Sequence, residues 1–392
     1  MTIFKEDIRR YEDELVNRVI PFWKNHCVDH KYGGYFTSLE RNGSIYDTEK
    51  YMWMQWRIVY MFALFAMSPY RKETFLPIAE QGFEFLTKHG KSPDGTYYFA
   101  LNRKGEPSIA TYNIFSDCFA AMGAAALFKA TGEKRYREEA DSAMKSYIRR
   151  MNNPKGSWEK ALPGKPKRLS LGHFMMLANL ASVMKEMLGS EEYEKDAGKA
   201  VNTVLERFWN PERKILFENV NTDGSFDLYS CEGRFVNPGH GLESMWFVLQ
   251  YAERKKRPGM IRKAAEITRG IFEFGTDREQ GGLFYFMDAL GKSHLELQWD
   301  MKLWWPHCEA LIAALYAYRL TGDKYFLDRF RETDTYAWSH FRDEKHPEWF
   351  AYLNRAGVPT HTLKGGKWKT FFHLPRALYF CIGEMRKIDA HE

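Results

Sequence analysis

The feature that most constrains the fold is an internal repeat. A short aromatic segment with strand-like alternation, usually followed by a polar turn, recurs six times at intervals of about 60 to 67 residues. Such segments ahead of NG, DG or KG turns predict small β-hairpins or extended loops. A period of this length indicates a fold built from successive copies of one unit. The six segments are GGYFTSLERNG (33–43), DGTYYFALNRKG (94–105), GSWEKAL (156–162), ILFENVNTDG (215–224), GGLFYFMDALG (281–291) and EWFAYLNRAG (348–357).

Each aromatic segment is followed by an apolar stretch of helical length, such as 169–188 and 304–322. These stretches are apolar nearly all round, which predicts buried helices. Between them lie segments with one apolar stripe and a charged face, such as 135–153 and 191–209, which predict helices exposed to solvent. Six repetitions of outer helix, hairpin and inner helix predict an all-α fold, an (α/α)6 barrel with short β-hairpins between the helices. Because no linker divides the chain, residues 1–392 are expected to form one domain.

Composition narrows the class of protein. A chain of 392 residues that is 44% hydrophobic and 28% charged fits a soluble globular protein. The net charge is only +6, and the basic residues are interspersed with acidic ones, which disfavours nucleic-acid binding. The first ten residues are polar and no apolar run approaches about 18 residues, so neither export nor membrane insertion is expected. The five cysteines lack CxxC spacing, which indicates reduced thiols in a cytoplasmic protein and no zinc site.

Four of the 12 histidines fall at equivalent positions of successive repeats. They follow one another at intervals of 67, 67 and 66 residues, each near the start of a predicted inner helix: His173, His240, His307 and His373. Prolines near three of them are typical of first helical turns. In a barrel, equivalent first-turn positions point toward the same mouth. We therefore expect the four imidazoles to converge on one cavity, with Glu243 and Glu309 a turn or less away.

The residue types at this mouth favour proton transfer. A helix N-terminus disfavours an imidazolium and a nearby carboxylate favours it, so such histidines can exchange protons near neutral pH. Histidines outnumber carboxylates there, which favours proton transfer at carbon over acetal cleavage by an acid pair. A satisfied core histidine is the alternative at each position. A metal site is the alternative for His240 and Glu243, at i, i+3 spacing, but no HExxH motif is present and we expect no metal.

Four long segments carry a resemblance to a known family. KYMWMQWRIVYMFA (50–63), VNPGHGLESMWFVL (236–249), KLWWPHCEALIA (302–313) and KGGKWKTFFHLPRALY (364–379) closely resemble the N-acylglucosamine 2-epimerase family, which is also known through renin-binding protein and cellobiose 2-epimerase relatives. The resemblance spans nearly the whole chain. The fold that it implies, an (α/α)6 barrel, coincides with the fold predicted from the repeat.

The resemblance implies reversible epimerisation at C2 of an open-chain aldose, with N-acetyl-D-glucosamine and N-acetyl-D-mannosamine as the first choice and no cofactor required. His240 and His373 resemble the acid/base pair that serves opposite faces of an enediolate. Glu243 resembles the carboxylate that orients and charges His240, and Glu309 resembles the other active-site acid. Arg57 resembles the cation that stabilises negative charge on the substrate oxygens.

The resemblance extends to substrate-binding residues. His173 resembles an axis histidine that assists ring opening or grips hydroxyl groups. Trp304 and Trp368 are candidate sugar-stacking residues, with core packing as the alternative for both. His307 is included for its repeat phase alone, because no family role corresponds to it.

Alternatives to this substrate and activity remain open. A 2-epimerase or aldose–ketose isomerase acting on mannose, glucose or cellobiose-type disaccharides would require only different loops. A lyase or hydrolase would need an acid pair at the mouth, and a non-catalytic sugar- or protein-binding barrel would not exchange substrate hydrogen with solvent. Some members of the family respond to ATP, and KGGK (364–367) is a weak signal for phosphate, so ATP is a candidate allosteric activator. The expected partner is a small sugar, with no nucleic acid or membrane, and a homodimer is a candidate assembly.

Overall fold

The computed structural model describes residues 3–111, 113–160, 162, 164–165, 167–292, 294 and 296–391. Helices make up most of these residues, and the strands are two or three residues long. The predicted mostly helical fold with short strands between helices is therefore confirmed.

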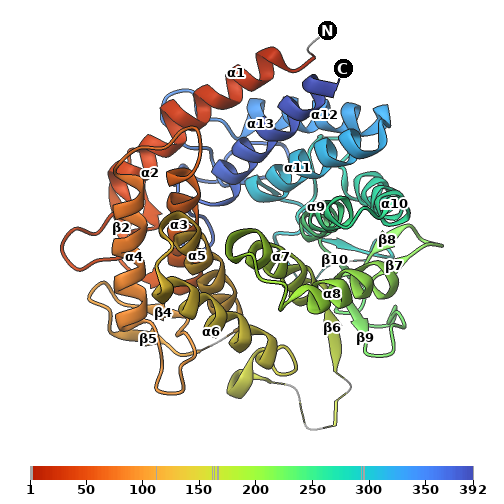
Figure 1. Cartoon of the computed structure of the whole chain (residues 1–392). Coiled ribbons are helices and arrows are strands. Elements are labelled where there is room, and N and C mark those ends of the chain that lie inside the picture. Colours follow the sequence, from red (N-terminus) through yellow and green to blue (C-terminus); the bar gives the residue numbers. More distant parts are fainter. Residues whose placement is uncertain are drawn as a thin grey trace.

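Six buried helices form an inner ring (Figure 1). Each contacts the next inner helix along the chain, from α3 to α13. Phe65 of α3 packs on Tyr379 of α13, with ring centroids 5.6 Å apart, and so closes the ring. The inner helices are α3 (Met52–Ala66), α5 (Phe115–Thr131), α7 (Leu171–Leu188), α9 (Pro238–Arg254), α11 (Trp304–Thr321) and α13 (His373–His391).

An outer helix follows each inner helix except the last and packs against it (Figure 1). The outer helices carry one apolar stripe, which is buried, and a charged face, which is exposed. At the N-terminus, α1 (Lys5–Asp13), the π-helical η1 (Glu14–Val19) and α2 (Ile20–His26) run on from one another, and α1 and η1 pack on α13. The other outer helices are α4 (Phe75–His89), α6 (Lys134–Arg150), α8 (Glu194–Arg207), α10 (Pro258–Gly275) and α12 (Lys324–His340).

The inner helices are buried because their residues are apolar or small on every side. In α11, every residue from Trp304 to Ala317 is buried. Small residues let these helices approach closely, as at Gly123 of α5. A Cβ atom on Gly123 would lie 2.9 Å from the indole of Trp56 in α3. Alternation of large and small side chains therefore sets the spacing of the inner ring.

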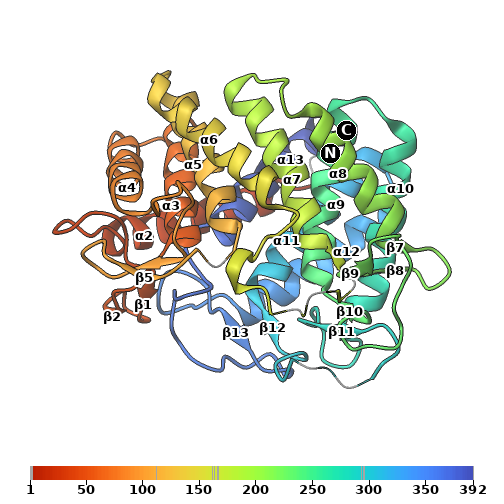
Figure 2. The ribbon, with the colours of Figure 1, turned by 90° about the horizontal axis from the view of Figure 1, so that it is seen from below.

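Short strands tie neighbouring repeats together near the N-terminal ends of the inner helices. The strand that precedes α9, β10 (Phe235–Val236), pairs with β11 (Met287–Asp288) of the next repeat. The strand that precedes α11, β12 (Lys302–Leu303), pairs with β13 (Tyr352–Leu353) in the same way. These four strands lie together at one end of the helices (Figure 2).

The other strands follow the same plan or close local hairpins. The strand before α3, β3 (Lys50–Tyr51), pairs with β4 (Ala100–Leu101), and β4 also pairs with β5 (Pro107–Ile109). The strand before α7, β6 (Arg168–Ser170), pairs with β9 (Asn219–Asn221). Local hairpins join β1 (Ser38–Leu39) to β2 (Ile45–Asp47) and β7 (Trp209–Asn210) to β8 (Ile215–Leu216).

Of the hairpin or extended loop predicted for each aromatic segment, the described residues of GSWEKAL form no hairpin. Residues Gly156–Trp158 form a short 3₁₀ helix, η2, and two of the residues in this region, 161 and 163, lie outside the described part of the chain. The segment contains Gly and Ser with a single aromatic residue. It therefore offers little of the alternating apolar surface that a strand needs to pair.

Three outer helices end on a histidine that packs over a turn glycine of the aromatic segments. A side chain on the glycine would collide with the imidazole, since the added Cβ would lie 2.5 to 2.6 Å from a ring atom in each case. All three glycines also have positive φ, which glycine adopts without strain. The pairs are His26 with Gly43, His89 with Gly105 and His340 with Gly357.

The two ends of the chain lie close together (Figure 1). The backbone N–H of Ile3 donates to Oδ1 of Asp389 at 2.9 Å, so the first and last described helices are joined directly. Among the helices of the described residues, none combines the length and apolar character that crossing a bilayer requires.

Candidate active site

A cavity of about 630 Å³ opens among the first turns of the inner helices. Its lining is largely aromatic, and a few charged side chains project into it. Four of the predicted site residues with charge or acid/base character line it: Arg57, His240, Glu243 and His373. The aromatic lining includes Trp53, Phe119, Tyr285, Trp304, Trp305 and Trp368. Apolar walls with a few converging polar groups are typical of small-molecule sites.

His240 lies in the first turn of α9. The Asn237 side chain caps this helix by accepting from the His240 backbone N–H at 3.1 Å. The imidazole Nδ1 lies 3.1 Å from both carboxylate oxygens of Glu218, which leaves Nε2 for a substrate. Burial lowers the pKa of His240, but the Glu218 carboxylate, with Glu243 and Glu309, outweighs burial and holds the pKa above its ordinary value.

The predicted partner of His240 was wrong in one respect. Glu243 had been expected to orient and charge His240, but the carboxylate in contact with the ring is Glu218, from the segment between β8 and β9. The backbone of Glu218 is fixed from both sides: its N–H donates to the Phe235 carbonyl and its carbonyl accepts from Leu171. Glu243 acts on His240 only through the field of its charge.

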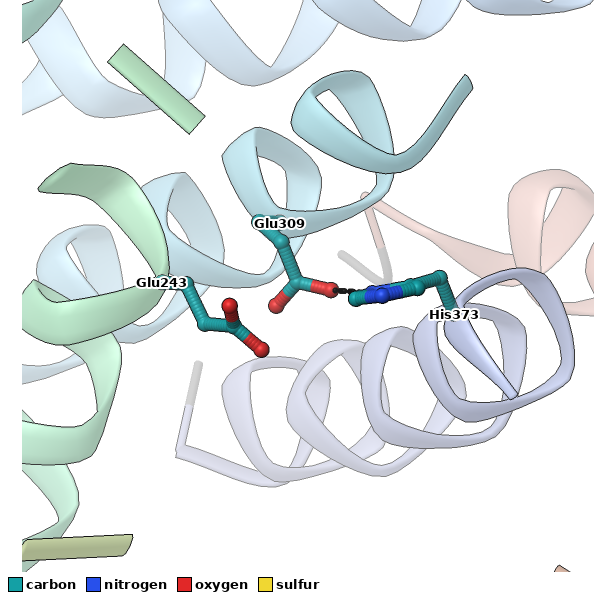
Figure 3. Close-up of side chains that lie close together, drawn as sticks. All are labelled: Glu243, Glu309 and His373. Atoms are coloured by element: carbon teal, nitrogen blue, oxygen red, sulfur yellow. Dashed lines mark hydrogen bonds and ion pairs between the residues drawn. The ribbon is translucent and has the colours of Figure 1, made fainter. Parts of the chain in front are cut away.

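His373 begins α13, and its Nδ1 lies 2.7 Å from Oε1 of Glu309 (Figure 3). Glu309 is completely buried, and its second oxygen accepts from the Trp246 indole at 2.8 Å. Burial, and then the positive charges of Arg57 and Arg376, lower the pKa of His373 well below its ordinary value. His373 is therefore a neutral imidazole whose Nδ1–H donates to Glu309.

The two histidines consequently differ in how readily they hold a proton, because the pKa of His240 is raised and that of His373 is lowered. The indole of Trp305 contacts both rings, at centroid distances of 5.3 Å from His240 and 5.6 Å from His373. Two titratable groups whose pKa values are pushed apart in one cavity are suited to act as an acid and a base.

Arg57 is a buried cation that no carboxylate contacts. Its guanidinium lies over the rings of Trp53, Phe119 and Phe372, and its Nε has no hydrogen-bond partner. Among the described residues, no carboxylate oxygen lies within ion-pair distance of it. Burial lowers the pKa of Arg57 to about 9, so the side chain remains charged at neutral pH. A buried charge without a partner is costly, and this guanidinium is available to a negative charge at the cavity.

His173 and His307 do not join this pair, so the expectation that four imidazoles meet in one cavity is wrong. His307 is completely buried: its Nδ1–H donates to the Leu303 carbonyl at 2.6 Å and its Nε2 accepts from the Leu283 N–H at 3.0 Å. Burial lowers the pKa of His307 to about 3. With both nitrogens bonded to the backbone, His307 is a structural residue and does not bind substrate.

His173 lies at the start of α7, beside the cavity rather than in its lining. Its ring packs on Phe115, with centroids 5.8 Å apart, and its carbonyl accepts from the Tyr147 hydroxyl. Burial lowers the pKa of His173 to about 4, against the opposing charge of Glu218. A neutral His173 behind the lining is compatible with a supporting role near Glu218.

The two predicted tryptophans both line the cavity but differ in exposure. Trp304 is buried, with its ring against Tyr352 and His373. Trp368 is 54% exposed, and its ring meets Trp53 edge-on at 5.4 Å. Trp368 is therefore free to stack on a ligand, whereas Trp304 mainly forms part of the wall.

The KGGK segment offers less to a phosphate than its sequence suggests. The Lys364 ammonium is completely buried, 2.8 Å from Oδ2 of Asp343 and 2.7 Å from the Glu348 carbonyl. Its charge is thus already neutralised. Lys367 is exposed and lies over the Trp368 ring at 5.2 Å.

Donor atoms of Glu243, Glu309 and His373 all lie within 4.8 Å of one another and project from α9, α11 and α13 (Figure 3). Such a set resembles a metal site, but a guanidinium already lies among the two carboxylates. Nη2 of Arg376 is 2.7 Å from Oε1 of Glu243 and 2.6 Å from Oε1 of Glu309. A metal ion would have to displace this buried arginine, so the donors do not fit a metal site.

Glu218 and Arg376 are the functional residues that sequence reasoning missed. Arg376 lies one helical turn after His373, in the segment FHLPRALY, and i, i+3 spacing places the two on the same face of a helix. This signal could have been found. Glu218 lies 22 residues before His240, and only the pairing of the short strands brings the two together.

A ring of helices whose mouth holds an acid/base pair of histidines, a free guanidinium and aromatic walls is an enzyme site suited to moving a proton on a small polar ligand. The match to a family model is consistent with this class. Residues 34–377 match the model of N-acylglucosamine 2-epimerase (GlcNAc 2-epimerase), and the chain belongs to this family.

Curated relatives match over nearly the full length. The N-acylglucosamine 2-epimerase of Bos taurus is 38% identical over 397 residues, which cover 96% of this chain and 92% of that protein. The enzyme of the same name from Mus musculus is 39% identical over 385 residues, covering 95% and 90%. The cellobiose 2-epimerase of Bacteroides fragilis is 23% identical over 417 residues, covering 97% and 99%.

Solved structures share the fold at lower identity. The cellobiose 2-epimerase of Bacillus thermoamylovorans superposes with a TM-score of 0.83 at 18% identity, covering 97% of this chain and 99% of that chain. A D-mannose isomerase gives 0.83 at 17% identity, covering 97% and 98%. These similarities concern the fold alone.

Proposed function

We propose that the protein interconverts N-acetyl-D-glucosamine and N-acetyl-D-mannosamine by epimerisation at C2. The observation that carries the proposal is the pair of imidazoles, each bound through Nδ1 to its own carboxylate, at one aromatic cavity. The names of relatives at 38% and 39% identity support the choice of substrate.

In the proposed reaction, the open-chain sugar places its C1 carbonyl beside Arg57 and its C2 between His240 and His373. One imidazole removes the C2 proton through Nε2, and the electron pair of the C–H bond moves into an enolate of the C1 carbonyl, because C2 of these sugars carries the acetamido nitrogen. The Arg57 guanidinium stabilises the negative charge that develops on oxygen. The other histidine, protonated, delivers a proton to the opposite face of C2, which yields the epimer. The direction of the reaction decides which histidine acts first.

The remaining features of the proposal concern the whole protein. The two layers of helices are proposed to be an (α/α)6 barrel that forms one catalytic domain over residues 1–392. Catalysis is proposed to need no metal or organic cofactor, because acid, base and cation are all side chains. We propose a cytoplasmic enzyme that assembles as a homodimer. Activation by ATP remains a prediction, and Lys367 rather than Lys364 has an ammonium free for a phosphate.

The proposal is tested by incubating the purified protein, with a chelator present, with N-acetylglucosamine, N-acetylmannosamine, mannose, glucose and cellobiose separately. Products are resolved by chromatography and mass spectrometry. We expect the two N-acetylated sugars to interconvert with no change in mass. Conversion of only the unmodified sugars or cellobiose would contradict the substrate. Release of a fragment would indicate a lyase or hydrolase, and binding without turnover would indicate a binding protein.

A further inference from the structure

Arg376 is the most completely buried cation beside the catalytic pair. Its side chain is 2% exposed, and its guanidinium packs over the rings of Trp246 and Phe372, at 5.2 and 4.4 Å. Arg376 is not among the residues that line the 630 Å³ cavity, and the proposed reaction does not use it to bind the substrate. Its charge therefore acts on its protein neighbours.

Those neighbours are two carboxylates that could not lie side by side alone. Glu243 and Glu309 are 5% and 0% exposed, and Oε1 of each accepts a hydrogen bond from the same nitrogen, Nη2 of Arg376. Two buried carboxylates whose oxygens lie within 4.8 Å of each other repel unless a cation lies between them. In many proteins a metal ion fills that position.

Oε1 of Glu309 has a second donor, which links the carboxylates to catalysis. It accepts from Nδ1–H of His373 at 2.7 Å as well as from Arg376 at 2.6 Å. Nη2 of Arg376 also lies 3.4 Å from Nδ1 of His373. A positive charge this close disfavours the imidazolium, so the imidazole is neutral before it takes the C2 proton.

We propose that Arg376 is a positioning residue that takes the place of a metal ion: it holds the carboxylates of Glu243 and Glu309 side by side and fixes His373 as a neutral base with Nε2 free. The base assignment rests on the proposed function, whereas the charge arrangement does not. His373 is surrounded by charged groups from four helices: Arg57 on α3, His240 and Glu243 on α9, Glu309 on α11 and Arg376 on α13. The two arginines balance the two carboxylates.

Loss of Arg376 would leave two negative charges against one positive charge. The His373 imidazole would then gain a proton more readily, and its pKa would rise. Because the base must be neutral, the acid limb of kcat/KM should move to higher pH. The freed carboxylates and imidazole should also accept a divalent cation, since their donor atoms lie within 4.8 Å of one another.

The experiment compares Arg376→Met, which removes the charge at similar length, with Arg376→Lys, which retains it. Arg319→Met is the matched control, because Arg319 of α11 also bridges Glu253 of α9 and Glu384 of α13, near the other ends of the same helices. Three quantities are measured: the His373 titration by NMR, kcat/KM against pH, and binding of Mn²⁺ alone by calorimetry.

We expect Arg376→Met to raise the pKa of His373 by about one to three pH units and to move the acid limb of kcat/KM upward by the same amount. We also expect this variant to bind Mn²⁺. Wild type, Arg376→Lys and Arg319→Met should keep a neutral His373 and bind no Mn²⁺. A folded Arg376→Met protein with a wild-type titration and no Mn²⁺ binding would overturn the proposal. If that variant does not fold, the NMR titration and the calorimetry of the wild-type protein still test the proposal. A wild-type His373 that titrates above pH 7, or Mn²⁺ binding by wild type, would overturn the proposal. Absence of epimerase activity in wild type would refute the proposed function but leave the NMR and calorimetry as tests of Arg376.

Discussion

At the scale of single residues, Arg57 and Arg319 are two buried arginines with opposite roles. Arg319 is paired with Glu253 and Glu384, so its charge stabilises the fold. Arg57 is paired with no carboxylate among the described residues, and its burial is offset by aromatic faces and by the more distant charges of Glu243 and Glu309. In the proposed reaction, the negative charge on the substrate oxygen is the missing partner of Arg57.

We predict that Arg57→Lys lowers kcat by about 10²- to 10³-fold, because a compact ammonium does not replace a planar donor at a developing oxyanion. Its melting temperature should stay close to that of wild type. Arg319→Lys should show the reverse, with a lower melting temperature and near-normal kcat. Steady-state kinetics and thermal melts of both variants test this contrast. A near-normal rate for Arg57→Lys would make Arg57 a structural residue.

Glu218 supports a prediction about pH. Glu218→Gln removes the charge that holds the pKa of His240 above its ordinary value, so that pKa should fall. His240 donates a proton in one direction only while it is protonated. The alkaline limb of kcat/KM for that direction should therefore move down by about one to two units. Glu232→Gln, at an exposed residue of the next segment, between β9 and β10, is the control. If the alkaline limb of kcat/KM stays in place in Glu218→Gln, the Glu218 carboxylate does not raise the pKa of His240.

The raised pKa of His240 also makes the stability of the folded protein depend on pH. Because the folded pKa is raised, the His240–Glu218 pair stabilises the protein fully below the unfolded value of about 6.5. This stabilisation is lost as the pH rises through the folded pKa.

Residue-level prediction succeeded where the signal lay within one helix. His240, His373, Glu243 and Arg57 line one cavity as predicted, because repeat phase and family motifs place them in the first two turns of inner helices. Glu218 was missed because its contact with His240 depends on strand pairing. His307 was misassigned because repeat phase fixes where a helix starts but not which backbone groups surround its first turn.

At the scale of elements, the pairing of strands between repeats holds the catalytic helix starts in register. The alternating aromatic segments predicted strands correctly in five of six places, and GSWEKAL was the exception. That the partner strand often lies in the next repeat could not be predicted. Strands of two or three residues carry too few side chains to specify a partner, and the packing of the helices decides it.

His307 belongs to this scale because it joins two elements. It links the Leu303 carbonyl at the start of α11 to the Leu283 N–H after α10. We predict that His307→Ala lowers the free energy of unfolding by about 2 to 4 kcal/mol, since both backbone groups lose buried partners. The kcat/KM of the folded enzyme should remain near wild type. Denaturant unfolding and kinetics test this, and a large loss of kcat/KM with unchanged stability would restore His307 to the site.

At the scale of the whole molecule, three buried ion clusters join successive repeats around the ring. In each, an aspartate that follows an outer helix binds a completely buried lysine and an arginine from an aromatic segment. The clusters are Asp29 with Lys50 and Arg103, Asp277 with Lys302 and Arg355, and Asp343 with Lys364 and Arg41.

We predict that Asp277→Asn lowers the free energy of unfolding by about 3 to 5 kcal/mol, because Lys302 is left as a buried charge without a partner. Burial raises the pKa of Asp277, but Arg355 and Lys302 outweigh burial and hold it below its ordinary value. Its stabilisation is thus present above about pH 4 and is lost as the pH falls through the folded pKa. Wild type should therefore lose more stability than the variant on acidification.

Urea unfolding at neutral and acid pH measures both effects. Glu138→Gln is the control, because its ion pair with Lys134 is exposed at both ends and should contribute little. Equal stability of the Asp277→Asn and Glu138→Gln variants would show that the buried clusters do not hold the ring together.

The central claim is that His240 and His373 serve opposite faces of C2, and it is tested most directly by hydrogen exchange in D2O. Histidine protons exchange with water, so turnover should place deuterium at C2 of the product. The measurement is the loss of the C2 proton signal of each N-acetylated epimer by NMR, with wild type, His240→Asn and His373→Asn. We predict that each variant loses net epimerisation but still exchanges the one epimer that faces its remaining histidine, and that the two variants spare opposite epimers. Exchange of the same epimer by both variants would contradict the two-face account and favour a single base.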